Sequence, residues 1–343
     1  MEIVIGLYII AIGSFCQSSS YVPIKKVKDW SWESFWLVQG IFAWLIFPVL
    51  GAQLAVPEGQ SLVGLYLDNL SRSMWPVFWG ILWGVGGLTF GLSMRYLGVA
   101  LGQSISLGTC AGLGTILGPV LLNIFFPELN ALESLTFAVI LGVVVTLVGI
   151  AVIGVAGAMK SSSLSEEEKK QAVKDFNFPK GLTIALLAGF MSGCFNVGLE
   201  FGKDINFGEL TEPMFRTLPA TLLVTLGGFI TNAVYCFYQN SKNHTWSDYG
   251  KSGVIVNNLL FCALAGLLWY SQFFGLSLGK GFLTSSPVLT TLAFCILMAL
   301  NVVFSNVWGI ILKEWKGCSR STIMVLVLGL AILIISSFLP QLL

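Results

Sequence analysis

The sequence predicts an all-α integral membrane protein with ten transmembrane helices, arranged as two inverted five-helix repeats. Of the 343 residues, 55% are hydrophobic and only 10% are charged, and the mean hydropathy is +0.84. A soluble domain carries about 25% charged residues, so this composition excludes a large soluble domain. Ten apolar runs are long enough to span a bilayer, which takes about 20 residues of helix. The two halves of the chain also resemble each other faintly.

The expected transmembrane helices follow one another along the whole chain. They cover residues 3–23, 34–55, 75–96, 98–122, 134–158, 181–201, 213–238, 253–278, 285–312 and 321–340. Residues 56–74 form a longer connection, whose apolar patch LVGLYL favours a segment at the membrane interface. The one clearly hydrophilic stretch separates the fifth and sixth helices. There Ser165 and Glu168 resemble a helix capping box and Pro179 marks a stop, so we expect a short solvated helix without a catalytic role.

The first expected helix ends in a polar and basic stretch, QSSSYVPIKKVKDWSWE, which runs from Gln17 to Glu33. Lysines in the headgroup layer with tryptophans beside them are typical of a helix leaving a bilayer. Hydroxyl and amide groups inside the apolar run are costly unless they face a partner or a wet cavity. Gln17, Tyr21 and Lys25 recur every four residues and share one helix face. This stripe indicates either the lining of a cavity or polar contacts between helices.

An internal repeat is readable when GLYIIAIGSFCQSSSYV, which begins at Gly6, is aligned with GLTIALLAGFMSGCFNV, which begins at Gly181. In this alignment Tyr21 corresponds to Asn196 and Lys25 to Glu200. Because each half holds an odd number of helices, the second half enters the membrane from the opposite side, as in many secondary transporters. We therefore expect a first repeat over residues 1–159, a cytoplasmic linker over 160–180 and a second repeat over 181–343. Chance similarity between apolar runs is the alternative.

The basic residues predict the orientation. All but four of the 18 lysines and arginines fall in the connections after the odd-numbered helices; the exceptions are Arg72, Lys203, Arg216 and Lys280. Since cytoplasmic loops carry the excess of Lys and Arg, we expect those connections in the cytoplasm and both termini outside it. The start, MEIVIGLYII, has no basic residue before its apolar run, so we do not expect a cleavable signal peptide.

Several classes of chemistry are disfavoured by the composition. The net charge of +1 gives no reason to expect a nucleic-acid partner. The seven cysteines form no CxxC pair, so neither a metal site nor a disulfide framework is predicted, and no cofactor is expected. No HExxH motif, Walker loop or nucleophile with its base is present, which argues against an enzyme. The only histidine, His244, lies in a loop, so a histidine proton relay in the membrane is excluded.

Aromatic and amide side chains inside the spans suggest a sugar site. Trp269 and Gln272, in the stretch WYSQFF, are three residues apart and share a helix face. An aromatic ring stacks on the C–H surface of a sugar, and an amide bonds its hydroxyls. A place in the interfacial aromatic belt is the alternative for the tryptophans. The full set of candidate substrate-binding residues is Gln17, Tyr21, Trp83, Gln103, Asn196, Asn257, Trp269 and Gln272.

Four motifs resemble one known family in the same order and spacing: YVPIKKVKDWSWE, MRYLG at residues 94–98, WYSQFF, and ILKEW at residues 311–315. This family is the bacterial L-rhamnose–proton symporters, within the drug/metabolite transporter superfamily. The resemblance implies ten helices and import of L-rhamnose or a related deoxysugar with protons across the cytoplasmic membrane. A transporter of the same fold that exports, or carries without coupling, another small polar metabolite is the alternative.

A proton symporter needs a group that gains and loses a proton, and without a membrane histidine a carboxylate must supply it. Burial raises the pKa of a carboxylate and a nearby lysine lowers it. A carboxylate that meets Lys25 or Lys26 in one state and a dry cavity in another would therefore load and release a proton. Glu33 belongs to the shared WSWE motif, and Glu200 is the repeat equivalent of Lys25. We expect Glu33 to be the coupling residue and Glu200 to be the second candidate.

Overall fold

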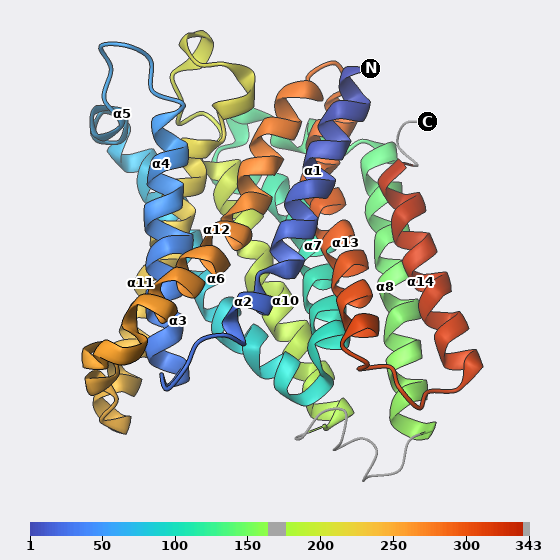
Figure 1. Ribbon diagram of the computed structural model, residues 1–343. Coiled ribbons are helices and arrows are strands. Elements are labelled where there is room, and N and C mark those ends of the chain that lie inside the picture. Colours follow the sequence, from blue (N-terminus) through green and yellow to red (C-terminus); the bar gives the residue numbers. More distant parts are fainter. Residues whose placement is uncertain (164–175, 339–343) are drawn as a thin grey trace. The chain divides into compact units, whose positions relative to one another are not determined.

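The computed structural model describes residues 1–163 and 176–338, and every regular element within these ranges is a helix (Figure 1). The α-helices are α1 (Glu2–Ser19), α2 (Tyr21–Ile24), α3 (Trp32–Gly40), α4 (Phe47–Gln53), α5 (Leu62–Asp68), α6 (Leu70–Leu97), α7 (Val99–Phe125), α8 (Phe137–Ser163), α10 (Phe178–Phe201), α11 (Leu218–Asn243), α12 (Ser252–Phe282), α13 (Pro287–Ile311) and α14 (Arg320–Phe338). A π-helical segment, η1 (Ile41–Ile46), joins α3 to α4, and short 3-10 turns fill the connections, among them η6 (Trp246–Gly250). The expected capping box at Ser165 and Glu168 lies outside the described residues.

Within the described residues, nine helical stretches are long and apolar enough to cross a membrane. They are Glu2–Ile24, Trp32–Gln53, Leu70–Leu97, Ser104–Phe125, Phe137–Lys160, Phe178–Phe201, Pro213–Asn243, Ser252–Phe282 and Pro287–Ile311. Each overlaps one of the first nine expected spans, so an all-helical integral membrane protein is confirmed. The tenth expected span, 321–340, corresponds to the shorter apolar stretch Arg320–Ser336 of α14. Its last residues, from 339, lie outside the described part of the chain.

The chain divides into two compact units, each assembled from both halves of the sequence. The first unit comprises Met1–Gly84 and Phe201–Phe282, and the second comprises Val85–Glu200 and Leu283–Leu343. Helices from before and after the expected linker therefore pack together inside each unit. The expected repeats, 1–159 and 181–343, describe a symmetry of the sequence and remain a prediction.

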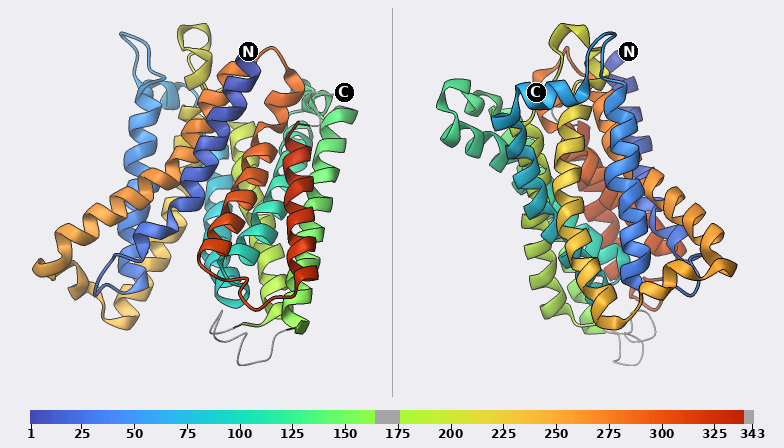
Figure 2. Two further views of the ribbon diagram at one scale, coloured as in Figure 1. Left: turned by 45° about the vertical axis from the view of Figure 1, so that its right-hand side comes forward. Right: turned by 90° about the vertical axis from the view of Figure 1, so that its left-hand side faces the viewer.

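In the first unit, α1 lies antiparallel against α12 (Figures 1 and 2). The two backbones approach so closely that only glycine fits at the contact. A Cβ added at Gly13 would lie 2.9 Å from Ser271 O and 3.1 Å from Gln272 Cα, and one added at Gly279 would lie 2.8 Å from Gly6 O. Continuing this antiparallel register by one helical turn brings Gln17 level with the turn of α12 that holds Trp269.

The second expected span of this unit is one continuous helix, α3–η1–α4, whose middle is π-helical. Pro48, just beyond η1, has no backbone N–H to donate to the carbonyl of Trp44 four residues earlier, which favours a local change in the hydrogen-bond pattern. The span packs against α11 and α12. Residues in and after a π-helical turn are rotated about the helix axis relative to a continuous α-helix. Trp44, inside η1, therefore projects in a direction that α-helical periodicity alone does not give.

In the second unit, α7 packs against α8 and α13, and α14 runs alongside α8 (Figures 1 and 2). Polar side chains join these apolar helices. Thr146 Oγ1 donates to Ser336 Oγ at 3.0 Å, and Asn306 Nδ2 donates to Ser104 Oγ at 2.6 Å. Buried polar groups that are paired in this way fix the register between helices, because an unpaired group in hydrocarbon is costly.

Candidate functional site

Three tryptophans from three helices of the first unit meet, and we call them the tryptophan cluster: Trp44 of η1, Trp83 of α6 and Trp269 of α12. Ring centroids are 5.9 Å apart for Trp44 and Trp83, 6.0 Å for Trp44 and Trp269, and 5.7 Å for Trp83 and Trp269. The ring plane of Trp44 is nearly perpendicular to those of Trp83 and Trp269, at 86° and 84°. Aromatic pairs attract each other at these separations. The cluster unites the two tryptophans named from the sequence and adds Trp44.

Two glycines make room for rings of the cluster, and the surrounding residues bury Trp44. A Cβ at Gly40 would lie 2.6 Å from Trp44 Cζ3, and a Cβ at Gly228 would overlap the Trp83 ring. Trp44 is 3% exposed, and its indole Nε1 is a buried donor without a hydrogen-bond partner among the described residues. A buried donor without an acceptor costs about 1–3 kcal/mol. The Trp44 indole is therefore able to bind a hydroxyl oxygen that enters the cluster.

An amide side chain of α12 lies next to this cluster, and one of α1 lies at the same level of the helix pair. Gln272 is buried and its Nε2 donates to the carbonyl of Trp269 at 3.1 Å, one turn back along α12. Gln17 is buried on α1, where its Oε1 accepts from Ser18 Oγ at 3.5 Å. Tyr21 follows in α2 and is half-buried. Three of the predicted first-unit residues, Trp83, Trp269 and Gln272, are thus brought together, and the register of α1 on α12 places Gln17 level with Trp269.

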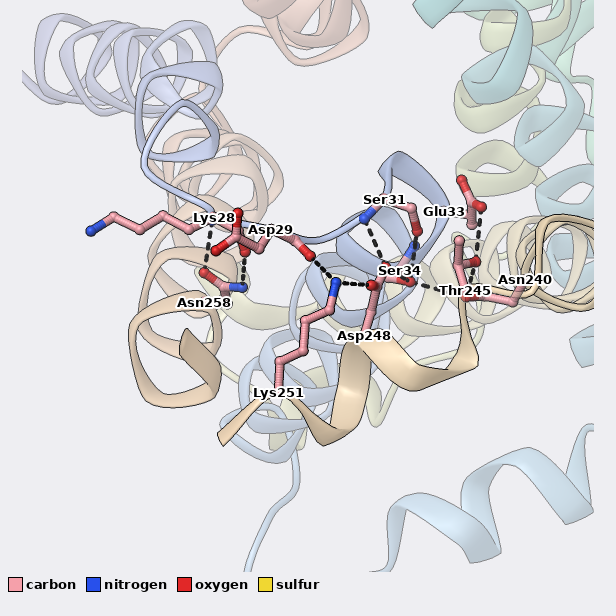
Figure 3. A network of polar contacts seen from close by, with 10 residues as sticks. All are labelled: Lys28, Asp29, Ser31, Glu33, Ser34, Asn240, Thr245, Asp248, Lys251 and Asn258. Atoms are coloured by element: carbon pink, nitrogen blue, oxygen red, sulfur yellow. Dashed lines mark hydrogen bonds and ion pairs between the residues drawn. The ribbon is translucent and has the colours of Figure 1, made fainter. Parts of the chain in front are cut away.

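Asn257, another candidate of the first unit, lies near the start of α12. Its Nδ2 donates to the Lys26 carbonyl and to Asn258 Oδ1, each at 3.0 Å. Asn258 in turn accepts from the Lys28 N–H at 3.0 Å and donates to its carbonyl at 2.7 Å (Figure 3). Along α12, Asn257 is 12 residues from Trp269, which corresponds to about 18 Å. Its amide therefore fastens the connection after α2 and is not brought to the tryptophan cluster.

The remaining candidates belong to the second unit. Asn196 is 3% exposed on α10; its Nδ2 donates to the Gly114 carbonyl at 3.0 Å, and its Oδ1 is buried without a partner among the described residues. Glu200, at the end of α10, is half-buried, and its Cγ lies so near Gly118 that an added Cβ there would be 2.8 Å away. Gln103 lies in α7, and its side chain is outside the described part of the structure.

Glu33 belongs to a polar network, which we call the Glu33–Asp248 network: Ser31, Glu33, Ser34, Asn240, Asn243, Thr245, Asp248 and Lys251. Figure 3 shows all of these residues except Asn243. Glu33 is 6% exposed in the first turn of α3. Its Oε1 accepts from Asn243 Nδ2 and from Thr245 Oγ1, each at 2.9 Å. Neither partner is a lysine, so in this conformation neutral donors from the end of α11 and the next connection hold the carboxylate.

Asp248 of η6 is the second buried carboxylate of the network. It accepts from Lys251 Nζ at 2.6 Å, the Ser31 backbone N–H at 2.8 Å and Ser34 Oγ at 2.9 Å (Figure 3). Burial alone would raise the pKa of Asp248, but these hydrogen bonds outweigh it and lower the pKa from an ordinary 3.8 to about 2. Asp248 therefore stays ionised and ties the start of α3 to the connection between α11 and α12.

We expect this depressed pKa to make the fold sensitive to acid. The contribution of Asp248 to the free energy of unfolding, about 2 kcal/mol, is fully present above pH 4 and is lost as the pH falls toward 2. Asp248→Asn should therefore lower the unfolding temperature in detergent at pH 7, and the difference from wild type should shrink at pH 3. Asp204, whose exposed pair with Arg72 is 3.7 Å long, is the matched control. Asp204→Asn should change little at either pH, because exposed ion pairs contribute little; equal effects of the two substitutions would contradict this account.

Comparison with known proteins gives one consistent result. Residues 1–342 match the family described as L-rhamnose-proton symport protein (RhaT). Proteins named L-rhamnose-proton symporter from Salmonella gallinarum (strain 287/91 / NCTC 13346) and Salmonella typhi are each 32% identical over 345 residues. Each alignment covers 98% of this chain and 96% of the relative. The similarity thus includes both compact units and every candidate residue.

Proposed function

Since the chain belongs to the L-rhamnose-proton symport protein (RhaT) family, we propose that it imports L-rhamnose together with protons across the bacterial inner membrane. The observation that carries this proposal is the family match over residues 1–342. The relatives are named as symporters, so the protein is a transporter and not an enzyme. The apolar helices of the described residues agree with a multi-pass membrane protein.

The sugar binds at the tryptophan cluster in this proposal. L-Rhamnose has an apolar C–H face and a methyl group that suit an indole face, and hydroxyls that need donors and acceptors. Trp269 and Trp83 supply the faces, Gln272 and Gln17 supply amides, and the unpartnered N–H of Trp44 supplies a donor. Tyr21 completes the proposed set at this cluster. Asn257, and Asn196 and Gln103 of the second unit, stay separate proposed contacts. This assignment is supported by the convergence of aromatic and amide groups from η1, α6 and α12.

Glu33 carries the proton in this proposal, with Glu200 as the second candidate. The support is that Glu33 is buried and that its partners are neutral hydroxyl and amide groups. Such partners can bind either the carboxylate or the carboxylic acid, whereas a lysine partner would hold the charged form. Trp36 lies one turn after Glu33, and its ring centroid is 5.6 Å from that of Trp44. Trp36 thus connects the proposed proton site with the tryptophan cluster.

The proposed architecture has ten transmembrane helices in two inverted repeats, with both termini outside the cytoplasm. Contacts inside the first unit support an arrangement in which odd-numbered and even-numbered connections lie on opposite sides of the membrane. The connections after the first and seventh spans meet through Ser31 and Asp248. Those after the second and sixth spans meet where Arg72 pairs with Asp204. Both pairs agree with an arrangement in which odd-numbered connections share one side of the membrane and even-numbered ones share the other.

A topology reporter tests the orientation. We expect a fluorescent protein that matures only in the cytoplasm to give no signal when fused after Leu343, because the basic connections should lie in the cytoplasm. The same reporter inserted after Lys169, in the expected cytoplasmic linker, should fluoresce. Bright fluorescence of a transport-competent fusion at Leu343 would reverse the orientation.

Uptake assays with a panel of sugars test the function. Cells that express the protein should accumulate labelled L-rhamnose above the external concentration, and a proton uncoupler should abolish the accumulation. Accumulation of a different metabolite, or equilibration of rhamnose that the uncoupler does not affect, would favour the exporter or uniporter alternative.

A further inference from the structure

Asn240 of α11 lies between the two buried carboxylates of the Glu33–Asp248 network (Figure 3). Its Oδ1 is 3.0 Å from Thr245 Oγ1 on one side and 3.0 Å from Ser34 Oγ on the other. Each hydroxyl also contacts a carboxylate. Thr245 Oγ1 is 2.9 Å from Glu33 Oε1, and Ser34 Oγ is 2.9 Å from Asp248 Oδ2. One chain of hydrogen-bond distances therefore joins Glu33 to Asp248 through Asn240.

The hydroxyls of Thr245 and Ser34 divide their hydrogens among three acceptor oxygens when both carboxylates are ionised. A hydroxyl has a single hydrogen to donate, so two hydroxyls supply two hydrogens to three acceptor oxygens. Asn240 cannot turn its amide to help, because its Nδ2 already donates to the Cys236 carbonyl at 2.9 Å and to Tyr249 at 3.3 Å. Charged acceptors form the stronger hydrogen bonds. Glu33 Oε1 also accepts from Asn243 Nδ2, and Asp248 Oδ2 also accepts from the Ser31 N–H. The oxygen of Asn240, which is fully buried, has only the two hydroxyls as donors.

A proton added to Glu33 frees the Thr245 hydrogen for Asn240, because Thr245 Oγ1 lies within hydrogen-bond distance of both. The protonated carboxyl donates to Thr245 Oγ1, the Thr245 hydroxyl turns and donates to Asn240 Oδ1, and Ser34 continues to donate to Asp248. One proton enters and resides on Glu33, and no other covalent bond is made or broken. Asp248 does not compete for this proton, since Lys251 pairs with it at 2.6 Å.

The other titratable groups near Glu33 leave this arrangement intact. The elements packed against α3 are α11, α12, η1 and η6. They present the Cys236 thiol from α11, the Cys262 thiol from α12, and Asp248 and Tyr249 from η6, while η1 presents none. Lys251 is occupied by Asp248 and by the Asp29 carbonyl. Among these groups, Glu33 is the carboxylate without a cationic partner.

We propose that Asn240 enables Glu33 to take up the transported proton, by accepting the Thr245 hydrogen that the protonated carboxyl no longer needs. Asn240 is thus a positioning residue for proton coupling. This inference rests on the proposed function, with Glu33 as the coupling group. It predicts that substitutions at Asn240 shift the pH dependence of rhamnose accumulation. The direction of the shift depends on how strongly the new side chain accepts a hydrogen bond from Thr245.

Two substitutions with opposite expected shifts test the proposal. Asn240→Leu removes the acceptor, so the proton on Glu33 is held less tightly. The pH dependence of rhamnose accumulation should then move by about one unit toward acid. Asn240→Asp places a stronger acceptor there, and the pH dependence should move toward alkali. Gln239→Leu removes a neighbouring amide of the same helix, whose Nε2 donates to Tyr235 outside the network, and should leave the pH dependence unchanged.

Counterflow exchange of labelled rhamnose at a fixed pH shows whether each variant is folded and inserted. If Asn240→Leu does not insert, the alkaline shift of Asn240→Asp decides the question. Variants that exchange rhamnose and retain the wild-type pH dependence would overturn the proposal and leave Asn240 a packing residue. Absence of proton-coupled rhamnose transport in the wild-type protein would instead overturn the proposed function.

Discussion

Glu33→Gln should abolish uphill accumulation of L-rhamnose while exchange of the sugar down its gradient continues. Glutamine has nearly the shape of a protonated glutamate, so it can still contact Asn243 and Thr245, which lie 2.9 Å from Glu33 Oε1. It cannot release a proton, however, so the sugar gradient loses its energy source. The ratio of internal to external rhamnose should fall to about one, because no net driving force remains.

The comparison variant for this experiment is Glu200→Gln, which changes the second candidate carboxylate at the end of α10. If Glu33 carries the proton, Glu200→Gln should still concentrate rhamnose, and the uncoupler should still prevent it. If Glu33→Gln still concentrates rhamnose in an uncoupler-sensitive way, Glu33 only stabilises the start of α3. If, in addition, Glu200→Gln fails to concentrate rhamnose, Glu200 is the residue that carries the proton.

Trp269→Ala and Gln272→Ala should weaken rhamnose binding while the protein remains folded and inserted. An aromatic contact contributes about 0.5–1.5 kcal/mol beyond its buried area, and a hydrogen bond contributes a similar amount. Loss of both corresponds to a tenfold to hundredfold weaker affinity. Equilibrium binding of labelled rhamnose to purified protein measures the effect of each substitution and of the double variant.

Trp246→Ala is the control for the tryptophan cluster. Trp246 is 47% exposed in η6 and packs against Phe237 and Tyr249, outside the cluster. Its replacement should leave rhamnose affinity near that of the wild type. If Trp269→Ala and Gln272→Ala bind as wild type does, the stretch WYSQFF serves helix packing and the sugar binds elsewhere.

The helices and the family could be predicted from the sequence because both leave local signals. Apolar runs report the spans directly, and the motifs YVPIKKVKDWSWE and WYSQFF lie within single segments. Trp83 and Trp269 were candidates because they occur inside spans, away from the interface. Trp44 meets the same criterion, but its place beside them depends on the π-helical turn at Ile41–Ile46, which periodicity does not reveal.

The polar network could not be predicted, because its members are far apart in the sequence. Glu33 binds Asn243 and Thr245, which follow it by 210 and 212 residues. Ser34 and Asp248 are separated by 214 residues, and the loop around Asp248 resembles any solvated connection. Asn257 shows the reverse case. Its polarity inside a span predicts a contact with the substrate, whereas its amide already donates to the Lys26 carbonyl and to Asn258 Oδ1.

Sugar-driven proton movement in proteoliposomes tests the central claim most directly. Purified protein is reconstituted with a pH-sensitive dye in the lumen, and L-rhamnose is added outside without any imposed proton gradient. If the protein is a rhamnose–proton symporter, the lumen acidifies when L-rhamnose enters, and it does not acidify with a sugar that the protein does not bind. Entry of labelled L-rhamnose without any change in luminal pH would contradict this account.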